Sequence, residues 1–181
     1  MKAILDTSSL LHLALYYIPV DKSGQLKTFI ETKYHHGDIV VIDKVIEECQ
    51  QNRGGLVMTE FPFLKDKKLH IKTEYLLPDQ RFFNLLKNEF INHDLVRKKD
   101  LSPTAVDLYK NNFLNSADCK MLLYAQSIAS EGPLIVTEET RYTNDGKIVK
   151  KIPSNCHFLN ISCCSLPTLL SNHYQLEFRL I

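Results

Sequence analysis

The sequence has almost no net charge, because 22 lysines and arginines are balanced by 21 aspartates and glutamates, which leaves a formal charge of +1. A basic field over the whole molecule, which many nucleic-acid-binding proteins use, is therefore excluded. Contact with a polyanion would need a local basic patch or a bound metal. Disorder is also excluded, since 44% of the residues are hydrophobic and disordered chains combine low hydrophobicity with high net charge.

Long apolar segments are missing as well. No run approaches the roughly 20 residues that a membrane-spanning helix needs. The first residues reach Asp6 before an apolar region of signal-peptide length can form. No repeat, low-complexity segment or linker divides the 181 residues, a length typical of one domain. We therefore predict a single domain over residues 1–181, located in the cytoplasm and without membrane contact.

Cysteines are present, but no pair of them has the Cys-x-x-Cys spacing of a zinc knuckle. Their number is five, and Cys163 and Cys164 are adjacent, which argues against a disulfide framework. We predict reduced thiols with a packing role.

Strand and helix patterns alternate along the chain. Short apolar runs predict strands at residues 3–5, 39–42, 133–136 and 158–161. Helical spacing of apolar residues follows each of the first two runs. Expected helix caps are Ser8 or Ser9, Ser102 before Pro103, and Asn115 or Ser116. The alternation predicts an α/β fold in which helices cover both faces of a parallel sheet.

Acidic residues stand where such a fold places its sites, beyond the carboxyl ends of the strands. Asp6 directly follows the first predicted strand, and Glu139 comes shortly after the run 133–136. Asp118 lies in the first turn of the helix after Ser116. Glu47 and Glu48 lie in the helix after the second strand, so acids from four places could meet at one edge.

Clustered carboxylates repel one another unless a cation joins them. Oxygen-only sites suit Mg²⁺ or Mn²⁺ rather than zinc, and such a metal activates water for phosphodiester hydrolysis. The pattern alone leaves a structural role open for each acid. Asp6 could cap the first helix, Asp118 could interact with a helix dipole, and the glutamates could be solvated surface residues.

Four segments together resemble the PIN-domain family of metal-dependent ribonucleases. They are Ile4–Leu10, Val45–Cys49, Ala117–Ala125 and Ile135–Glu139, and they occur in the order of the family. The segment Lys150–Cys156 is similar to a bacterial, toxin-like PIN subfamily with glutamate at the fourth acidic position. The resemblance implies a three-layer α/β/α sandwich with a central parallel sheet.

The resemblance also implies a divalent-metal-dependent endoribonuclease that uses Mg²⁺ or Mn²⁺ and has RNA as its substrate. The catalytic and metal-binding residues it implies are Asp6, Glu48, Asp118 and Glu139. Glu47 is the alternative to Glu48 at the second position, because the two are adjacent. Thr7 and Ser8 correspond to a position where a hydroxyl could support a ligand or a water.

A basic segment follows the fourth acid. Its members are Arg141, Lys147, Lys150 and Lys151. We hypothesise that some of them contact RNA phosphates, which would supply the local positive charge that the whole chain lacks. A solvated surface loop is the other interpretation.

Partners and alternative functions follow from the same resemblance. Many PIN proteins are toxins of bacterial toxin–antitoxin pairs and form dimers, so an antitoxin and a homodimer are candidate partners. The middle region, residues 56–114, is longer than in the shortest toxins and could shape the substrate site or enlarge a helical face. The main alternative is a catalytically silent PIN-fold scaffold that binds RNA or protein. A phosphatase with a second Asp two residues after Asp6 is disfavoured because Ser8 stands there.

Overall fold

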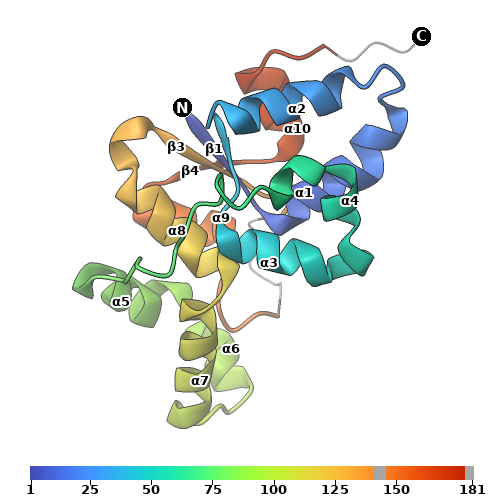
Figure 1. Cartoon of the computed structure of the whole chain (residues 1–181). Coiled ribbons are helices and arrows are strands. Elements are labelled where there is room, and N and C mark those ends of the chain that lie inside the picture. Colours follow the sequence, from blue (N-terminus) through green and yellow to red (C-terminus); the bar gives the residue numbers. More distant parts are fainter. Residues whose placement is uncertain (141–145, 178–181) are drawn as a thin grey trace.

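The computed structural model describes residues 1–140 and 146–177 (Figure 1). Helices and strands alternate in it, with short 3-10 and π-helical turns denoted η. In chain order the elements are β1 (Lys2–Leu5), α1 (Thr7–His12), η1 (Leu13–Tyr17), η2 (Ile18–Val20), α2 (Gln25–His35), β2 (Ile39–Val40), α3 (Asp43–Gln51), η3 (Asn52–Gly55), α4 (Leu56–Glu60), η4 (Pro62–Lys65), α5 (Gln80–Leu85), η5 (Leu86–Phe90), α6 (His93–Lys98), α7 (Pro103–Leu114), α8 (Ala117–Ser127), η6 (Ala129–Glu131), β3 (Pro133–Val136), α9 (Ile152–Leu159), β4 (Ser162–Cys164), α10 (Leu166–Thr168) and η7 (Leu169–His173).

The described strands form one four-stranded parallel sheet in the order β2-β1-β3-β4. Ile4 of β1 is in register with Val40 of β2 on one side and with Ile135 of β3 on the other. All three side chains are buried, as expected for apolar strands that are covered on both faces. The sheet therefore brings the carboxyl ends of β1 and β3 side by side.

Helices cover the sheet on two sides, with α2 and α10 on one side and α3, α8 and α9 on the other (Figure 1). A contact between the rings of Phe29 in α2 and Tyr174, 5.2 Å between centroids, packs the residue that follows η7 against α2. The fold is thus α/β with a parallel sheet, consistent with an α/β sandwich. No helix in the described ranges combines the length and apolar character needed to cross a membrane.

Two of the predicted caps are confirmed. The Ser102 hydroxyl accepts from the Ala105 amide ahead of Pro103, and the Ser116 hydroxyl accepts from the Cys119 amide. The predicted capping of the first helix by Ser8 or Ser9 is wrong, because α1 already begins at Thr7 and Asp6 occupies the N-cap position.

The strand predicted at residues 158–161 is also wrong. Its first half is the end of α9, which starts with Pro153 in its first turn and stops at Asn160, where φ is 55°. The strand of this region, β4, comes two residues later, with Cys163 in register with Ile135. Short apolar runs do not distinguish a buried strand from one face of a helix, which explains the error.

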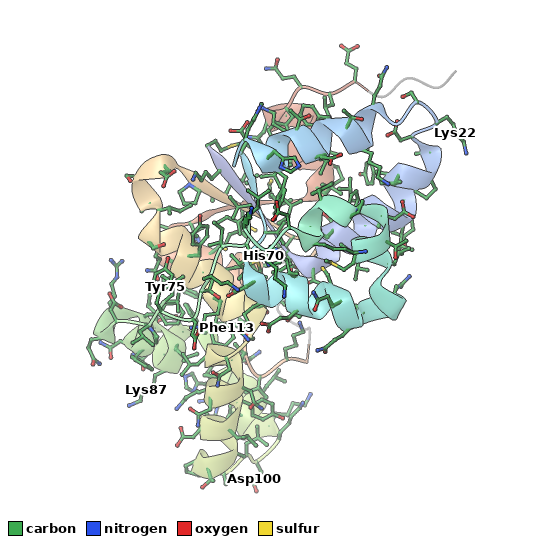
Figure 2. All side chains as sticks on the ribbon, in the orientation of Figure 1. Lys22, His70, Tyr75, Lys87, Asp100 and Phe113 are labelled. Atoms are coloured by element: carbon green, nitrogen blue, oxygen red, sulfur yellow. The ribbon has the colours of Figure 1, made fainter. Side chains whose placement is uncertain are left out.

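Part of the middle region projects away from the sheet. The helices α5, α6 and α7 and the turn η5, residues 80–114, lie below the body in Figure 1, and we call them the projecting helices. Figure 2 shows Phe113 where they join the body and Asp100 at their far end. Phe90 anchors the junction, because its ring contacts those of Phe82, Phe113 and Phe158.

Backbone pairing also ties the projecting helices to the chain after Glu139. The Asn92 amide donates to the Ile148 carbonyl at 2.8 Å, and the Lys150 amide donates to the Phe90 carbonyl at 2.8 Å. The segment 146–150 therefore has a fixed position between the sheet edge and α7.

Candidate functional site

The carboxyl edge of the sheet places Asp6 at the centre of the candidate site. Its amide donates to the Val136 carbonyl at 3.0 Å, so the end of β1 is bonded to the end of β3. The Thr137 amide continues the pattern by donating to the Cys164 carbonyl at 3.0 Å. Asp6 is only 6% exposed, although it is an acid that follows a short strand. Its backbone position is thus set by the sheet itself.

Two hydroxyls hold the Asp6 side chain. The Ser8 Oγ donates to Asp6 Oδ2 at 2.7 Å, and the Thr137 Oγ1 donates to the same oxygen at 2.8 Å. Asp6 makes no side-chain cap bond to α1, so the capping role that its position suggested is not observed. The carboxylate instead faces the carboxyl ends of the strands.

Glu48 reaches the same region from α3. Its Oε2 accepts a hydrogen bond of 2.6 Å from the Thr7 hydroxyl. Glu47 points elsewhere, since its side chain is 56% exposed and pairs with Lys44 at 2.7 Å. Consecutive helical residues are rotated by about 100°, so only one of two adjacent glutamates can face α1. The structure thus turns Glu48, and not Glu47, towards the other acids.

Glu139 and Glu138 also have different surroundings. Glu139 Oε1 accepts from the Lys147 ammonium at 2.8 Å, and its Oε2 accepts from the Ile152 amide at the start of α9. Glu138 Oε1 accepts from the Leu166 amide at the start of α10. Glu138 therefore fixes the C-terminal helix, whereas Glu139 is the glutamate that lies with a lysine beside the other acids.

Asp118 enters from the first turn of α8 and is partly buried. In residues 1–140 and 146–177, no group donates a hydrogen bond to its carboxylate. Burial and the negative charges of Asp6, Glu139 and Glu48 together raise the pKa of Asp118 to about 7, although the charge of Lys147 opposes the rise. Of the four acids, Asp118 is the one whose negative charge the described residues stabilise least.

The pKa values of Asp6 and Glu48 shift in the same direction as that of Asp118. Burial raises the pKa of Asp6 despite its hydrogen bonds, and the charge of Glu139 adds to the rise. Burial also raises the pKa of Glu48, and the charge of Asp6 contributes. Carboxyls from four separate elements thus share one electrostatic environment, an arrangement that is costly for folding and common at functional sites.

The donor set fits a hard divalent cation. All the groups are carboxylate and hydroxyl oxygens, which Mg²⁺ and Mn²⁺ prefer. Within the described part of the chain, no three acid, histidine or cysteine side chains are grouped closely enough to hold an ion by themselves. Mg²⁺ normally binds through one or two carboxylates and keeps several waters, so this spacing suits a water-rich site. Asp118 is the strongest candidate for a metal ligand. A bound cation would neutralise its carboxylate, which no hydrogen bond from the described residues stabilises.

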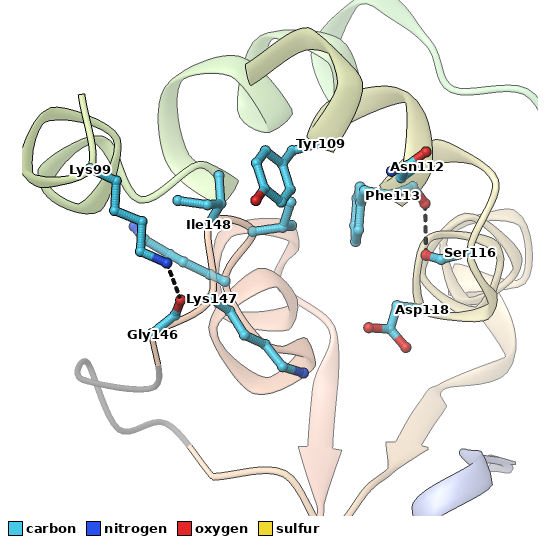
Figure 3. Close-up of a pocket in the computed structure, with 11 residues that line it drawn as sticks. Lys99, Tyr109, Asn112, Phe113, Ser116, Asp118, Gly146, Lys147 and Ile148 are labelled. Carbon is cyan, nitrogen blue, oxygen red and sulfur yellow. Dashed lines mark hydrogen bonds between the residues drawn. The ribbon is translucent and has the colours of Figure 1, made fainter. Parts of the chain in front are cut away.

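A pocket of about 370 Å³ opens beside Asp118 (Figure 3). One wall is α7, and the other is the segment 146–150. Its lining residues are Lys99, Tyr109, Asn112, Phe113, Ser116, Asp118, Gly146, Lys147, Ile148, Val149 and Lys150. The acids at the sheet edge are therefore continuous with a cavity that the projecting helices complete.

The predicted basic residues have mixed surroundings. Lys147 and Lys150 line the pocket, and the Lys150 ammonium also lies 5.0 Å from the ring centroid of Phe158. Lys151 precedes α9 as its N-cap residue. Arg141 lies outside the described residues. Contact of these residues with RNA phosphates stays a prediction.

Sequence reasoning missed three features of the site. Thr137 was part of the recognised motif, but its direct hydrogen bond to Asp6 was not foreseen, although its place right after β3 is a usable signal. The ion pair of Lys147 with Glu139 joins residues eight positions apart and has no signature in the sequence. The pocket walls Tyr109 and Asn112 carry no motif either.

The fold and the site define an α/β protein in which acids from separate segments lie within electrostatic range of one another at the carboxyl edge of a parallel sheet. A family model described as "Domain of unknown function (DUF4411)" matches residues 4–176, so the chain belongs to this family. No curated protein and no solved structure matches the chain.

Proposed function

We propose that this protein is a divalent-metal-dependent endoribonuclease with a PIN-like fold. The observation that carries the proposal is the Asp118 carboxylate, which has a pKa near 7 and receives no hydrogen bond from the described residues. It lies in electrostatic range of Asp6, Glu48 and Glu139. Like charges held this close destabilise the folded protein, and such arrangements occur mostly at functional sites. A bound cation would remove the repulsion.

The residues around the acids have supporting roles in this proposal. Thr7 orients Glu48, and Ser8 and Thr137 orient Asp6, through hydrogen bonds of 2.6 to 2.8 Å. When bound, Mg²⁺ or Mn²⁺ supplies a water of lowered pKa and offsets charge on the phosphate. The oriented carboxylates would hold the ion.

Basic residues near the acids supply the contacts with RNA. Lys147 is 2.8 Å from Glu139 and lines the pocket, so its ammonium is placed to meet a phosphate that approaches the acids. Lys150 lines the same pocket. Arg141 and Lys151 remain candidates from the sequence. These residues would supply the local positive charge that the chain as a whole lacks.

A catalytically silent PIN-fold scaffold that binds RNA or protein is the second candidate. The ion pair between Lys147 and Glu139 favours it, because a lysine already neutralises one of the acids without a metal. The roles of toxin, antitoxin partner and homodimer rest on the resemblance to PIN toxins. The neighbouring gene is the first place to look for an antitoxin.

Cleavage of a mixed RNA pool by the purified protein tests the proposal. We expect cutting with Mn²⁺ or Mg²⁺, none with EDTA, and none by Asp118→Asn. Asp107→Asn is the matched control, because this aspartate lies on α7 with its side chain 66% exposed, and we expect it to cut normally. Cutting that persists in EDTA or in Asp118→Asn would refute the metal mechanism. No cutting by the folded protein with metal present would favour the scaffold.

A further inference from the structure

The pocket beside Asp118 has the features of a binding site for a small, flat ligand. Its volume of about 370 Å³ lies at the lower end of the range of roughly 300–1,000 Å³ for small-molecule sites. One nucleotide unit suits this size better than a longer piece of nucleic acid.

Aromatic rings form its apolar wall. Figure 3 shows the rings of Tyr109 and Phe113 pointing from α7 into the pocket. Phe113 is 6% exposed and belongs to the core of the junction, whereas Tyr109 is 41% exposed and free to cover a ligand. Ile148 adds apolar surface from the opposite segment. An exposed tyrosine next to a buried phenylalanine is a suitable platform for a base.

Polar groups are available next to these rings. Neither the Tyr109 hydroxyl nor the Asn112 amide has a hydrogen-bond partner in the parts of the chain that the structure describes. An amide offers both donors and an acceptor, which match the edge of an unpaired base. The backbone around them is held by α7, a helix of 12 residues that Ser102 caps.

Charge completes the site at its other end. Lys99, Lys147 and Lys150 line the pocket, and Lys99 is held towards it by a 3.4 Å hydrogen bond from its ammonium to the Gly146 carbonyl. Lys99 lies across the pocket from Asp118, whereas Lys147 extends towards the side of Asp118 (Figure 3) and is close enough to affect its pKa. The pocket therefore suits a ligand with an aromatic ring and an adjoining phosphate, because the aromatic wall can contact the ring and the lysines can contact the phosphate.

We propose that this pocket binds one unstacked nucleobase of single-stranded RNA, with the adjoining phosphate directed towards Asp118. The inference rests on the proposed nuclease function and gives the projecting helices a role in substrate selection. Tyr109 stacks on the base, Asn112 contacts its edge, and the lysines contact the backbone. Paired RNA is excluded, because its bases cannot leave the stack without the loss of pairing.

Binding and cleavage are measured separately to test the pocket. Binding of a fluorescein-labelled, eight-nucleotide single strand of mixed sequence is followed by anisotropy in EDTA, where no metal is present. Cleavage of the same strand is followed with Mn²⁺. The variants are Tyr109→Ala and Asn112→Ala, with Tyr109→Phe to retain the ring and Tyr75→Ala as an exposed tyrosine outside the pocket lining. Melting curves verify that each variant is folded.

We expect Tyr109→Ala to raise the dissociation constant about 5- to 150-fold, the effect of losing one base–aromatic stack. Tyr109→Phe should keep most of the affinity that Tyr109→Ala loses, because the ring is retained. Tyr75→Ala should stay within about twofold of the wild type, since ordinary surface changes have small effects. Asn112→Ala should also weaken binding, and the annealed duplex should bind more weakly than the single strand. Cleavage should show the same order through KM.

The outcomes separate this inference from the proposed function. If Tyr109→Ala weakens binding and the wild type does not cleave, the pocket stands and the nuclease proposal fails. If the wild type cleaves, but Tyr109→Ala changes neither the dissociation constant nor KM, the pocket proposal fails alone. Equal binding of duplex and single strand, or no binding of RNA by the wild type, would also overturn it.

Discussion

Replacing Asp118 by asparagine should make the metal-free protein more stable at neutral and alkaline pH. Asparagine has nearly the same shape as aspartate but carries no charge. In the wild type, burial and three neighbouring carboxylates raise the pKa of Asp118 from its ordinary 3.8 to about 7. The ionised form is therefore disfavoured in the folded state, and the substitution removes that penalty.

The size and sign follow from proton linkage. A rise in pKa from 3.8 to about 7 corresponds to about 4 kcal/mol against the ionised form, because each pKa unit is worth about 1.4 kcal/mol. The folded protein holds the proton to higher pH than the unfolded chain does. Wild-type stability therefore falls as pH rises from about 4 to about 7, and the loss is complete above that range. We expect an advantage for Asp118→Asn of about 2–4 kcal/mol above pH 7, with the lower value allowing for side-chain relaxation.

Urea unfolding in EDTA, followed by circular dichroism between pH 4.5 and 8.5, measures this difference. Asp107→Asn serves as the control, and its effect should stay within about 0.5 kcal/mol at every pH, because its side chain is solvated. The advantage of Asp118→Asn should shrink to about 1 kcal/mol or less near pH 4.5. A variant that is no more stable than the wild type at pH 8, or a difference that does not depend on pH, would refute the electrostatic reasoning.

Two further substitutions test the groups around the acids. Thr7→Val removes the hydroxyl that donates to Glu48 at 2.6 Å, and we expect Mn²⁺ affinity by calorimetry to fall about 10- to 100-fold, as is usual when a supporting bond is lost, with Thr7→Ser close to the wild type. Undiminished affinity in Thr7→Val would contradict this role. Glu138→Ala removes the acceptor for the Leu166 amide at 2.7 Å, so urea unfolding should show a loss of about 1–3 kcal/mol, against a near-neutral Glu47→Ala. Equal stability of the two variants would contradict the proposed function of Glu138 in holding α10.

The acids illustrate how far sequence reasoning reached. The position of Asp6 after a short apolar run predicted a side chain at the carboxyl edge of the sheet, and the structure places it there beside Thr137. The sequence left Glu47 and Glu48 undecided, since adjacent residues share one motif. The rotation of α3 separates them, because it pairs Glu47 with Lys44 and turns Glu48 towards Thr7.

Helix caps were predicted correctly where the capping bond depends only on residues that are close in the sequence. Ser102 and Ser116 cap the helices that they were predicted to cap, because an N-cap bond joins residues only three apart. The strand predicted at residues 158–161 was wrong, because a short apolar run can be a buried strand or one face of a helix, and only its tertiary packing decides. Its first half belongs to α9, and β4 begins directly after the run, at Ser162, where the register with β3 is set.

The sequence by itself therefore determined the alternation of helices and strands, most of the helix starts and the acids that the strand ends deliver to one edge. These features depend on the spacing of apolar residues along the chain and on hydrogen bonds between residues that are close in the sequence. Only the tertiary structure decided which glutamate faces Asp6, that Lys147 pairs with Glu139, and that α7 and residues 146–150 enclose a pocket next to Asp118. The physical reason is that each of these joins residues far apart in the chain, and packing of the whole core fixes their distance.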